Sequence, residues 1–526
     1  MSKASRVHNL RFLFLAGITL AAALIGALAV AAGTARAAPA CTPGAPGIGD
    51  AYYPNYGNGG YDVRNYDLDV AYDPASDVLD GKAKIRATAT QNLCSFNLDF
   101  VGMQLRSVEV NGMSAQWTRD DHELTVTPKS PLRDGRGFDV VARYDGVPVE
   151  FVIPGFNLRA GFMATPEGVT VAGQPEVAAA WYPVNDHPLD KASYDFAVTV
   201  PNGYEVVANG FLRETDTHKG ETTWDWEASE PMASYLATID VADWDVHEWE
   251  TDSGLPVYDA VDSNITGPVR EEIDSALALQ GEIVDLFSDT FGPYPFGTVG
   301  AIVPNQNDLR FALETQTRVV YSKRFWIDSQ GNPRNADFVV VHELAHQWYG
   351  DDVAVGRWQD IWLNEGFATY AEWLWEEHEG RATPQETFEA TYDAIPADDP
   401  FWTVVIGDPG VDNLFHDATY VRGAMTLQAL RNEVGDDAFF EILREWFASH
   451  SGGNATTPEL IALAEQISGQ QLDDLFDTWV FSAEKPPPEA VTGGGTSAAK
   501  SLSAKERSSA ESWLDGARRR IGNGRY

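Results

Sequence analysis

The sequence predicts a multidomain α+β protein, in which an all-β saddle or sandwich domain precedes an α/β-helical domain. Its 526 residues are enough for two or three domains. From Tyr61 to about Val241, apolar and polar residues alternate in short runs, as in half-buried strands. From about Arg270 onward, apolar residues recur mainly with helical spacing. This change of period divides the chain into a β part and a helical part.

The N-terminal segment is typical of a signal peptide. Three basic residues within the first eleven positions precede an apolar run from Phe12 to Ala32. Ala35-Arg36-Ala37 then fits a cleavage site of small residues. We therefore predict a signal peptide at residues 1–37 and a secreted, extracellular protein. The alternative is an uncleaved membrane anchor, because the apolar run is long enough to span a bilayer.

The chain contains two cysteines, Cys41 and Cys94. In an exported protein we expect them to form one disulfide between the mature N-terminus and the first β segment. Lipid modification of Cys41 is the less favoured alternative, because the preceding Ala38-Pro39-Ala40 lacks the large aliphatic residue usual at such sites. Residues 38–60, rich in Gly, Pro and Tyr, are predicted to form an extended lead-in.

The formal net charge is −41 at pH 7, although both ends of the chain are basic. Such an acidic protein is a poor partner for nucleic acid. The charge suits a soluble secreted protein, and we expect no membrane partner once the signal peptide has been removed. Calcium would be a further option for acidic side chains, but no loop has the EF-hand pattern.

The β domain is predicted to span residues 61–247. Turn-forming pairs such as Asn111-Gly112 and Asp145-Gly146 separate its alternating segments. The predicted strands are Tyr66–Tyr72, Ala83–Ala89, Ser107–Val110, Leu124–Thr127, Val140–Tyr144, Phe196–Val200 and Leu236–Val241.

The second domain is predicted to span residues 248–485, and residues 486–526 form a flexible tail of low complexity. A helix fits Arg270–Phe287, and strands fit Thr298–Val303 and Phe311–Tyr321. Further helices are predicted at Pro384–Ile395, Thr419–Val434, Ala438–His450, Pro458–Ile467 and Leu472–Phe481.

The segment His342-Glu343-Leu344-Ala345-His346 lies in an apolar stretch that reads as a mostly buried helix. Residues four apart share one helix face, so His342 and His346 can bind one ion. Glu343 is rotated by about 100° from His342 and can act on a water at the metal instead. Glu365, after 18 intervening residues, is the natural third protein ligand of a catalytic zinc. We predict one Zn²⁺ per chain, rather than two ordinary helix histidines.

At these residues the chain resembles the gluzincin aminopeptidases, the family of aminopeptidase N and leukotriene hydrolase. The match is H-E-x-x-H followed by the glutamate of Trp362-Leu363-Asn364-Glu365-Gly366-Phe367-Ala368. Thermolysin-like endopeptidases share the two-helix arrangement, but the second motif indicates the aminopeptidase branch. The resemblance runs from about Tyr61 to Pro486. It implies a short two-domain secreted member with a thermolysin-like catalytic domain, without the large C-terminal helical domain of aminopeptidase N.

The resemblance also implies catalytic roles. Glu343 matches the general base, and Tyr420 in Tyr420-Val421-Arg422-Gly423 matches a tyrosine whose hydroxyl is directed at the reacting carbonyl. Glu314 matches the glutamate of the family's G-x-M-E-N strand, which binds the substrate amine. Here Phe311 and Thr315 replace the glycine and the asparagine of that segment.

Gln174-Pro175-Glu176 resembles the family's Q-x-E segment, which reaches the active site and binds the same amine. Gln174 and Glu176 are therefore predicted to bind substrate together with Glu314. The resulting prediction is a secreted zinc metalloaminopeptidase that hydrolyses the first bond of peptides with a free N-terminus. The alternatives are a zinc endopeptidase or an epoxide-type hydrolase on the same scaffold, or a binding module without catalysis.

Overall fold

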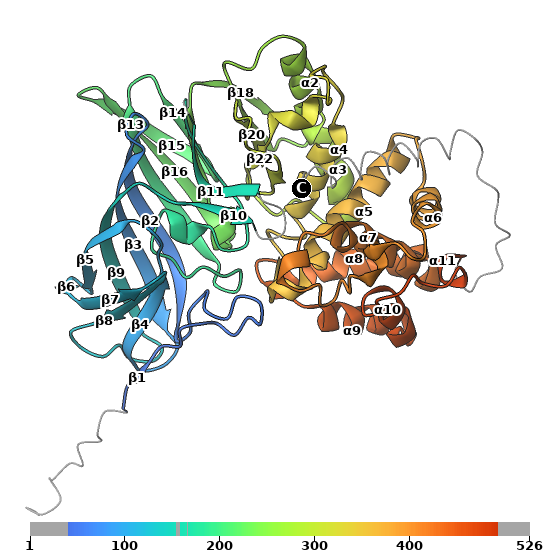
Figure 1. Cartoon of the computed structure of the whole chain (residues 1–526), viewed down its shortest axis with the longest axis horizontal. Coiled ribbons are helices and arrows are strands. Elements are labelled where there is room, and N and C mark those ends of the chain that lie inside the picture. The colour runs from blue at the N-terminus through green and yellow to red at the C-terminus, as the bar shows by residue number, and fades with distance from the viewer. Residues whose placement is uncertain (1–39, 154–157, 166, 493–526) are drawn as a thin grey trace, which may run out of the picture. The chain divides into compact units, whose positions relative to one another are not determined.

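The computed structural model describes residues 40–153, 158–165 and 167–492 (Figure 1). The predicted signal peptide at residues 1–37 lies outside this range, and so do residues 493–526 of the predicted tail. Cys41 and Cys94 are joined in the disulfide that the sequence predicts. Within the described part of the chain, no helix is both long enough and apolar enough to cross a membrane.

The largest sheet of the N-terminal domain has eight strands in the order β15-β16-β13-β2-β3-β9-β5-β6 (Figure 1). In β2 the side chains of Tyr66, Leu68, Val70 and Tyr72 are all buried, which confirms the predicted alternation. The strands are β2 (Tyr61–Asp73), β3 (Val78–Ala89), β5 (Gln104–Val110), β6 (Met113–Ser114), β9 (Gly137–Gly146), β13 (Ala192–Pro201), β15 (Phe211–His218) and β16 (Glu221–Met232).

Two smaller sheets complete this domain and confirm its all-β class. One has the order β1-β4-β8-β7 and contains β1 (Thr42–Pro43), β4 (Leu93–Asp99), β7 (Gln116–Asp120) and β8 (Glu123–Thr127). The other has the order β10-β11-β12-β17-β14 and contains β10 (Glu150–Ile153), β11 (Leu158–Thr165), β12 (Gly168–Ala172), β14 (Glu205–Ala208) and β17 (Ile239–Ala242).

The second domain begins after Asp243, where the next strand belongs to a separate five-stranded sheet. Its order is β18-β19-β20-β22-β21, with β18 (Trp244–Glu250), β19 (Pro256–Asp262), β20 (Val299–Val303), β21 (Ala312–Leu313) and β22 (Val319–Tyr321). The predicted single strand Phe311–Tyr321 is wrong: residues 314–318 form a turn between two short antiparallel strands. Thr315 Oγ1 donates to the carbonyl of Arg318 at 2.6 Å, so a side chain closes the turn.

The predicted helix Arg270–Phe287 is two helices, α2 (Pro268–Leu277) and α3 (Gln280–Phe291). The break at Ala278 and Leu279 contains neither Gly nor Pro, and Gly281 follows it in the first turn of α3. At the start of α3 the buried Gln280 donates from Nε2 to Asp259 Oδ1 of β19 at 2.8 Å. This tertiary hydrogen bond is a physical reason for the change of direction that helical periodicity alone does not reveal.

The remaining helices follow in the yellow-to-red part of the chain (Figure 1). They are α4 (Asp337–His346), α5 (Trp362–His378), α6 (Pro384–Ala394), α7 (Asp417–Val434), α8 (Asp436–His450), α9 (Thr457–Ser468), α10 (Asp473–Trp479) and α11 (Glu489–Thr492). The five helices predicted after residue 380 are confirmed as α6 to α10. Both α6 and α9 begin with a capping box, in which Thr383 or Thr456 pairs with a glutamate three residues later. Short strands β23 (Ala354–Val355) and β24 (Asn454–Ala455) pair in parallel.

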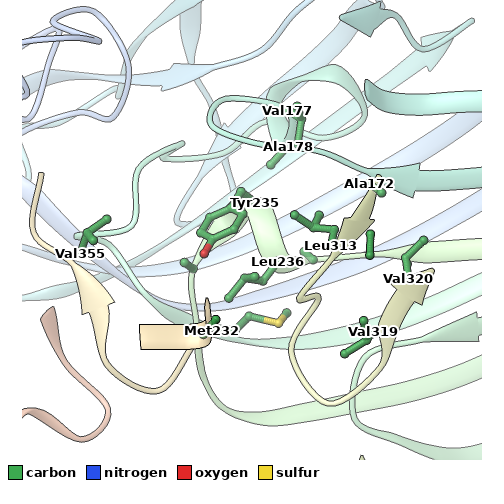
Figure 2. Packing of buried hydrophobic residues seen from close by; sticks show 14 of the residues in the cluster. Ala172, Val177, Ala178, Met232, Tyr235, Leu236, Leu313, Val319, Val320 and Val355 are labelled. Atoms are coloured by element: carbon green, nitrogen blue, oxygen red, sulfur yellow. The ribbon is translucent and has the colours of Figure 1, made fainter. Parts of the chain in front are cut away.

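The two domains touch through apolar side chains and through hydrogen bonds, which together are called the interdomain contact. Figure 2 shows Leu313, Val319 and Val320 of the second domain in one cluster with Leu236 and Ala172 of the first. Polar groups add to it: the Lys191 ammonium donates to the carbonyls of Asp351 and Asp352 at 2.7 and 2.8 Å.

The same contact fixes the turn at residues 314–318. Arg318 Nη2 donates to the Gly210 carbonyl at 2.6 Å, and Asn209 Nδ2 donates to the Gln316 carbonyl at 2.8 Å. Because Gly210 and Asn209 belong to the β domain, this domain holds the backbone of the turn that carries Glu314.

Candidate active site

The three predicted metal ligands meet between α4 and α5. His342 Nε2 and His346 Nε2 each lie 3.3 Å from Glu365 Oε2. The histidines are one helical turn apart on α4, and Glu365 lies in the first turn of α5. All three side chains are buried. The helices therefore present two imidazole nitrogens and one carboxylate oxygen to a single point.

Hydrogen bonds on the far side of each imidazole set its orientation. His342 Nδ1 donates to Glu372 Oε1 at 2.9 Å, and His346 Nδ1 donates to the Tyr349 carbonyl at 3.1 Å. With the ring protons on Nδ1, both Nε2 atoms keep lone pairs for a metal. Sequence reasoning missed Glu372, although it lies seven residues after Glu365 on the same face of α5.

The electrostatics of this cluster suit a divalent cation. Burial works to raise the pKa of Glu365, but His346 and His342 outweigh burial and lower that pKa to about 2. Burial works to lower the pKa of His342, but Glu365 and Glu372 raise it to about 9. The anionic glutamate thus keeps protons on the histidines, and a cation can take the place of these protons. Two His nitrogens and one Glu oxygen are a zinc donor set with room for a further ligand, so the residues fit zinc.

Glu343 lies beside this cluster and is also buried. Its carboxylate belongs to a second group, in which single ligand atoms of Glu314, Glu343 and His346 all lie within 4.8 Å of one another. Burial raises the pKa of Glu343 to about 8. The structure therefore brings the predicted general base and the predicted amine-binding glutamate to the same side of His346.

Tyr420 reaches the cluster because α5 and α7 touch. A Cβ atom on Gly366 would lie 2.8 Å from the Cα of Gly423, so neither glycine can carry a side chain without moving a helix. Tyr420 lies one turn before Gly423 on α7, and its ring centroid is 6.0 Å from that of His342. The glycines of both motifs thus permit the helix contact that places the tyrosine near the metal ligands.

The turn after β21 holds Glu314, whose side chain is 2% exposed. Tyr235 of the β domain donates to Glu314 Oε1 at 3.0 Å. Gln347, at the end of α4, donates to the Glu314 carbonyl at 3.1 Å and accepts from the Thr317 amide at 2.8 Å. Thr317 has a φ of 68°, an unfavourable conformation for a β-branched residue that costs about 1–3 kcal/mol. Tyr235 was not predicted, and no motif marks it.

Gln174 and Glu176 lie between β12 and the buried 3₁₀ turn Ala178–Ala180. Gln174 Oε1 and Glu176 Oε2 are buried, and no donor among the described residues reaches either atom. Gln174 lines a small cavity together with Phe311 and Tyr420. Burial raises the pKa of Glu176 to about 8, and its main charged neighbour is Asp186. The described structure thus brings Gln174 to Tyr420, whereas Glu176 is not in the group formed by Glu314, Glu343 and His346.

Comparison with known proteins matches both halves of the chain to one family. Residues 63–236 match the Peptidase M1 N-terminal domain, and residues 275–479 match the Peptidase family M1 domain. Aminopeptidase N of Streptomyces lividans is 27% identical over 317 residues, which are 57% of this chain and 36% of that protein. Aminopeptidase M1-D of Oryza sativa subsp. japonica is 24% identical over 442 residues, 79% of this chain and 49% of that protein. The chain therefore spans half or less of the length of these relatives.

A solved structure of similar size has the same fold. The crystal structure of the M1 zinc metallopeptidase from Deinococcus radiodurans has a TM-score of 0.75 and 27% identity, and the match covers 84% of this chain and 99% of that one. A variant of that enzyme bound to a Tyr-Ser-Ala substrate has a TM-score of 0.73 at 27% identity, with coverage of 84% and 99%. These matches confirm the fold and the resemblance: the chain belongs to the zinc metallopeptidases of peptidase family M1, with an M1 N-terminal domain followed by the M1 peptidase domain.

Proposed function

We propose that the protein is a zinc aminopeptidase that removes the first residue of peptides with a free N-terminus. The observation that carries the proposal is the convergence of His342, His346 and Glu365 beside Glu343 and Glu314 in one buried cluster. When bound there, zinc would polarise the scissile carbonyl and make water more acidic.

Two side chains would carry out the proton transfer and the charge stabilisation. Glu343 would take the proton of the attacking water and deliver it to the leaving amine, as a general base and then a general acid. Tyr420 would donate a hydrogen bond to the carbonyl oxygen as negative charge develops on it. The hydrogen bonds of Glu372 and the Tyr349 carbonyl would hold the two histidines still during these steps.

Glu314, together with Gln174 and Glu176, would bind the ammonium group of the substrate. A carboxylate suits this role because charge-assisted hydrogen bonds are stronger than neutral ones. An anchor for the ammonium places only the first peptide bond at the metal, which makes the enzyme an exopeptidase. Two observations on relatives support the assignment: several are named aminopeptidases, and the Deinococcus enzyme variant was solved with Tyr-Ser-Ala.

Removing a metal ligand tests the metal site itself. Glu365→Gln and His346→Ala should both lose the zinc held by α4 and α5, because each leaves only two protein ligands. Elemental analysis of the purified variants measures the loss. Glu377→Gln, an exposed position on the same helix, is the matched control and should keep the ion. Full occupancy of this site in the two ligand variants would contradict the assignment.

The role of Tyr420 is tested by Tyr420→Phe. We expect kcat to fall on the order of 10²-fold, because one hydrogen-bond donor to the developing oxyanion is lost. KM and zinc content should change little, since the ring still fills its place on α7. Tyr370→Phe is the matched control, because it removes a buried hydroxyl that donates to Gln428 Oε1 and not to a substrate. This variant should keep kcat near the wild-type value. A Tyr420→Phe enzyme with normal kcat would remove Tyr420 from the mechanism.

We also propose that the protein is secreted, because the N-terminal sequence has the signal-peptide pattern and the chain contains a disulfide. Intact-mass measurement of the exported protein should give a chain that begins near Ala38, two hydrogens lighter than its reduced form. A mass that includes residues 1–37, or a diacylglyceryl group on Cys41, would contradict this expectation.

A further inference from the structure

We propose a second metal site in the N-terminal domain, formed by Asp99, His122 and Glu123 and suited to Zn²⁺ or Mn²⁺. One ligand atom from each of these residues lies within 4.8 Å of the other two. The site lies in the four-stranded sheet, where Asp99 ends β4 and Glu123 begins β8. It shares no residue with the cluster between α4 and α5.

The strand register places two carboxylates directly opposite each other. Asp99 and Glu123 are partners in the antiparallel pairing of β4 and β8. Like charges at opposite positions of a sheet destabilise the pairing. Burial adds to this cost, because Asp99 is 0% exposed and both carboxylate oxygens of Glu123 are shielded from solvent. A bound cation would turn this unfavourable pair into a stabilising one.

Three carboxylate oxygens of this group have no hydrogen-bond partner among the described residues. Asp99 Oδ2 accepts from the Gly57 amide at 3.1 Å, from Asn58 Nδ2 at 3.1 Å and from the Asp186 amide at 2.8 Å. In contrast, no donor in the described chain reaches Asp99 Oδ1 or either oxygen of Glu123. A buried acceptor without a partner carries the full cost of its desolvation. A metal ion bound by Asp99, His122 and Glu123 would supply the partner that these oxygens lack.

His122 is held in the way usual for a metal-binding histidine. Its Nε2 lies 3.0 Å from the Asn55 carbonyl, and its ring stacks on Tyr56 with centroids 4.2 Å apart. When Nε2–H donates to this carbonyl, Nδ1 keeps its lone pair for a metal. The His122 side chain is 14% exposed, and the exposed Asp121 lies 3.6 Å from Nδ1. An ion from solvent can therefore reach the site past these two residues.

The donor set decides the class of metal. Ca²⁺ and Mg²⁺ prefer sites made of oxygen ligands. Imidazole favours Zn²⁺ among the common ions, and carboxylates also suit Mn²⁺. One imidazole with two carboxylates therefore selects these two ions over Ca²⁺. The rival explanation is a pair of neutral carboxyl groups that share protons and bind no metal.

A metal here would also stabilise the segment that follows the proposed substrate ligands Gln174 and Glu176. The Asp99 amide donates to the Val184 carbonyl at 2.7 Å, and the Val184 amide donates back at 3.0 Å. Asp99 thus holds the segment that follows Gln174 and Glu176. The role expected of the second ion is structural, since it lies among residues of the β domain.

The test is metal analysis of the full-length protein after equilibration with Zn²⁺ or Mn²⁺ and removal of free metal. The wild type should hold one ion more than Glu123→Gln or His122→Gln. Asp120→Asn, an exposed position in the same hairpin, is the matched control and should hold as many ions as the wild type. Glu365→Gln should lose the ion between α4 and α5 and keep this one, which separates the two sites.

Two further measurements make the result decisive. Zn²⁺ or Mn²⁺ should raise the Tm of Glu365→Gln, and the double variant Glu365→Gln/Glu123→Gln should show no such rise although it folds. A crystal soaked in Mn²⁺ should show an anomalous peak between the three side chains. The site does not exist if Glu123→Gln retains the same number of ions as the wild type, or if the wild type binds a single ion. Equal retention of Ca²⁺ would overturn the choice of metal.

Discussion

Glu343→Gln is expected to keep its zinc and to lose about 10²–10⁴-fold in kcat, the usual contribution of a general base. Glutamine has the shape of glutamate but cannot accept the proton of the attacking water. Glu343 lies close to His346 and Glu314 without being one of the three converging ligands, so the metal should stay. Steady-state kinetics with an aminoacyl chromogenic substrate, together with elemental analysis of the same sample, measures both effects.

The Glu377→Gln variant serves again as the control, because it removes a carboxylate from the surface of α5. Its kcat should match that of the wild type. If Glu343→Gln turned over substrate at a near-normal rate, Glu343 could not be the base. If it lost zinc, its role would be structural, and the base would have to be sought elsewhere in the cluster.

Glu314→Ala should lower kcat/KM for a peptide with a free N-terminus by about 10²–10⁴-fold. The removed carboxylate is buried, and leaving the substrate ammonium without its partner costs about 3–5 kcal/mol. Zinc content should be unchanged, because Glu314 is not one of the ligands that meet at Glu365. The measurement compares one peptide, free and N-acetylated, in the wild type and in the variant.

Acetylation is the internal control for this variant. It removes the positive charge and adds bulk where Glu314 lies, so the wild type should strongly prefer the free peptide. In Glu314→Ala the difference between the two peptides should shrink, because the anchor that distinguishes them is gone. Equal cleavage of both peptides by the wild type would show that no anchor exists, and the enzyme would then be an endopeptidase.

The parts of the fold that were predictable depend on local periodicity. Alternation in β2 places Tyr66 and Leu68 on the buried face whatever the rest of the chain does. In the same way, the spacing of His342 and His346 puts both on one face of α4. Glu365 could be predicted as a metal ligand because a motif of fixed spacing links it to these histidines.

The parts that were not predictable depend on contacts between distant segments. The turn at residues 314–318 is held in place by Gln347 and by the Asn209 side chain of the β domain, and no local pattern encodes these contacts. The break before Gln280 depends on Asp259 in a strand 21 residues earlier. Tyr235 belongs to the other domain, so its bond to Glu314 could be found only from the structure. Glu372 is the exception, because its helical spacing from Glu365 was visible.

The interdomain contact determines whether the peptidase domain can be separated from the β domain and fused to another protein. Without the β domain, the carbonyls of Asp351 and Asp352 would lose the Lys191 ammonium, and Glu314 would lose Tyr235. Apolar surface at Leu313 and Val320 would be exposed to water at the same time. The peptidase domain therefore depends on the β domain, and a fusion of the peptidase domain to another protein would have to include both domains.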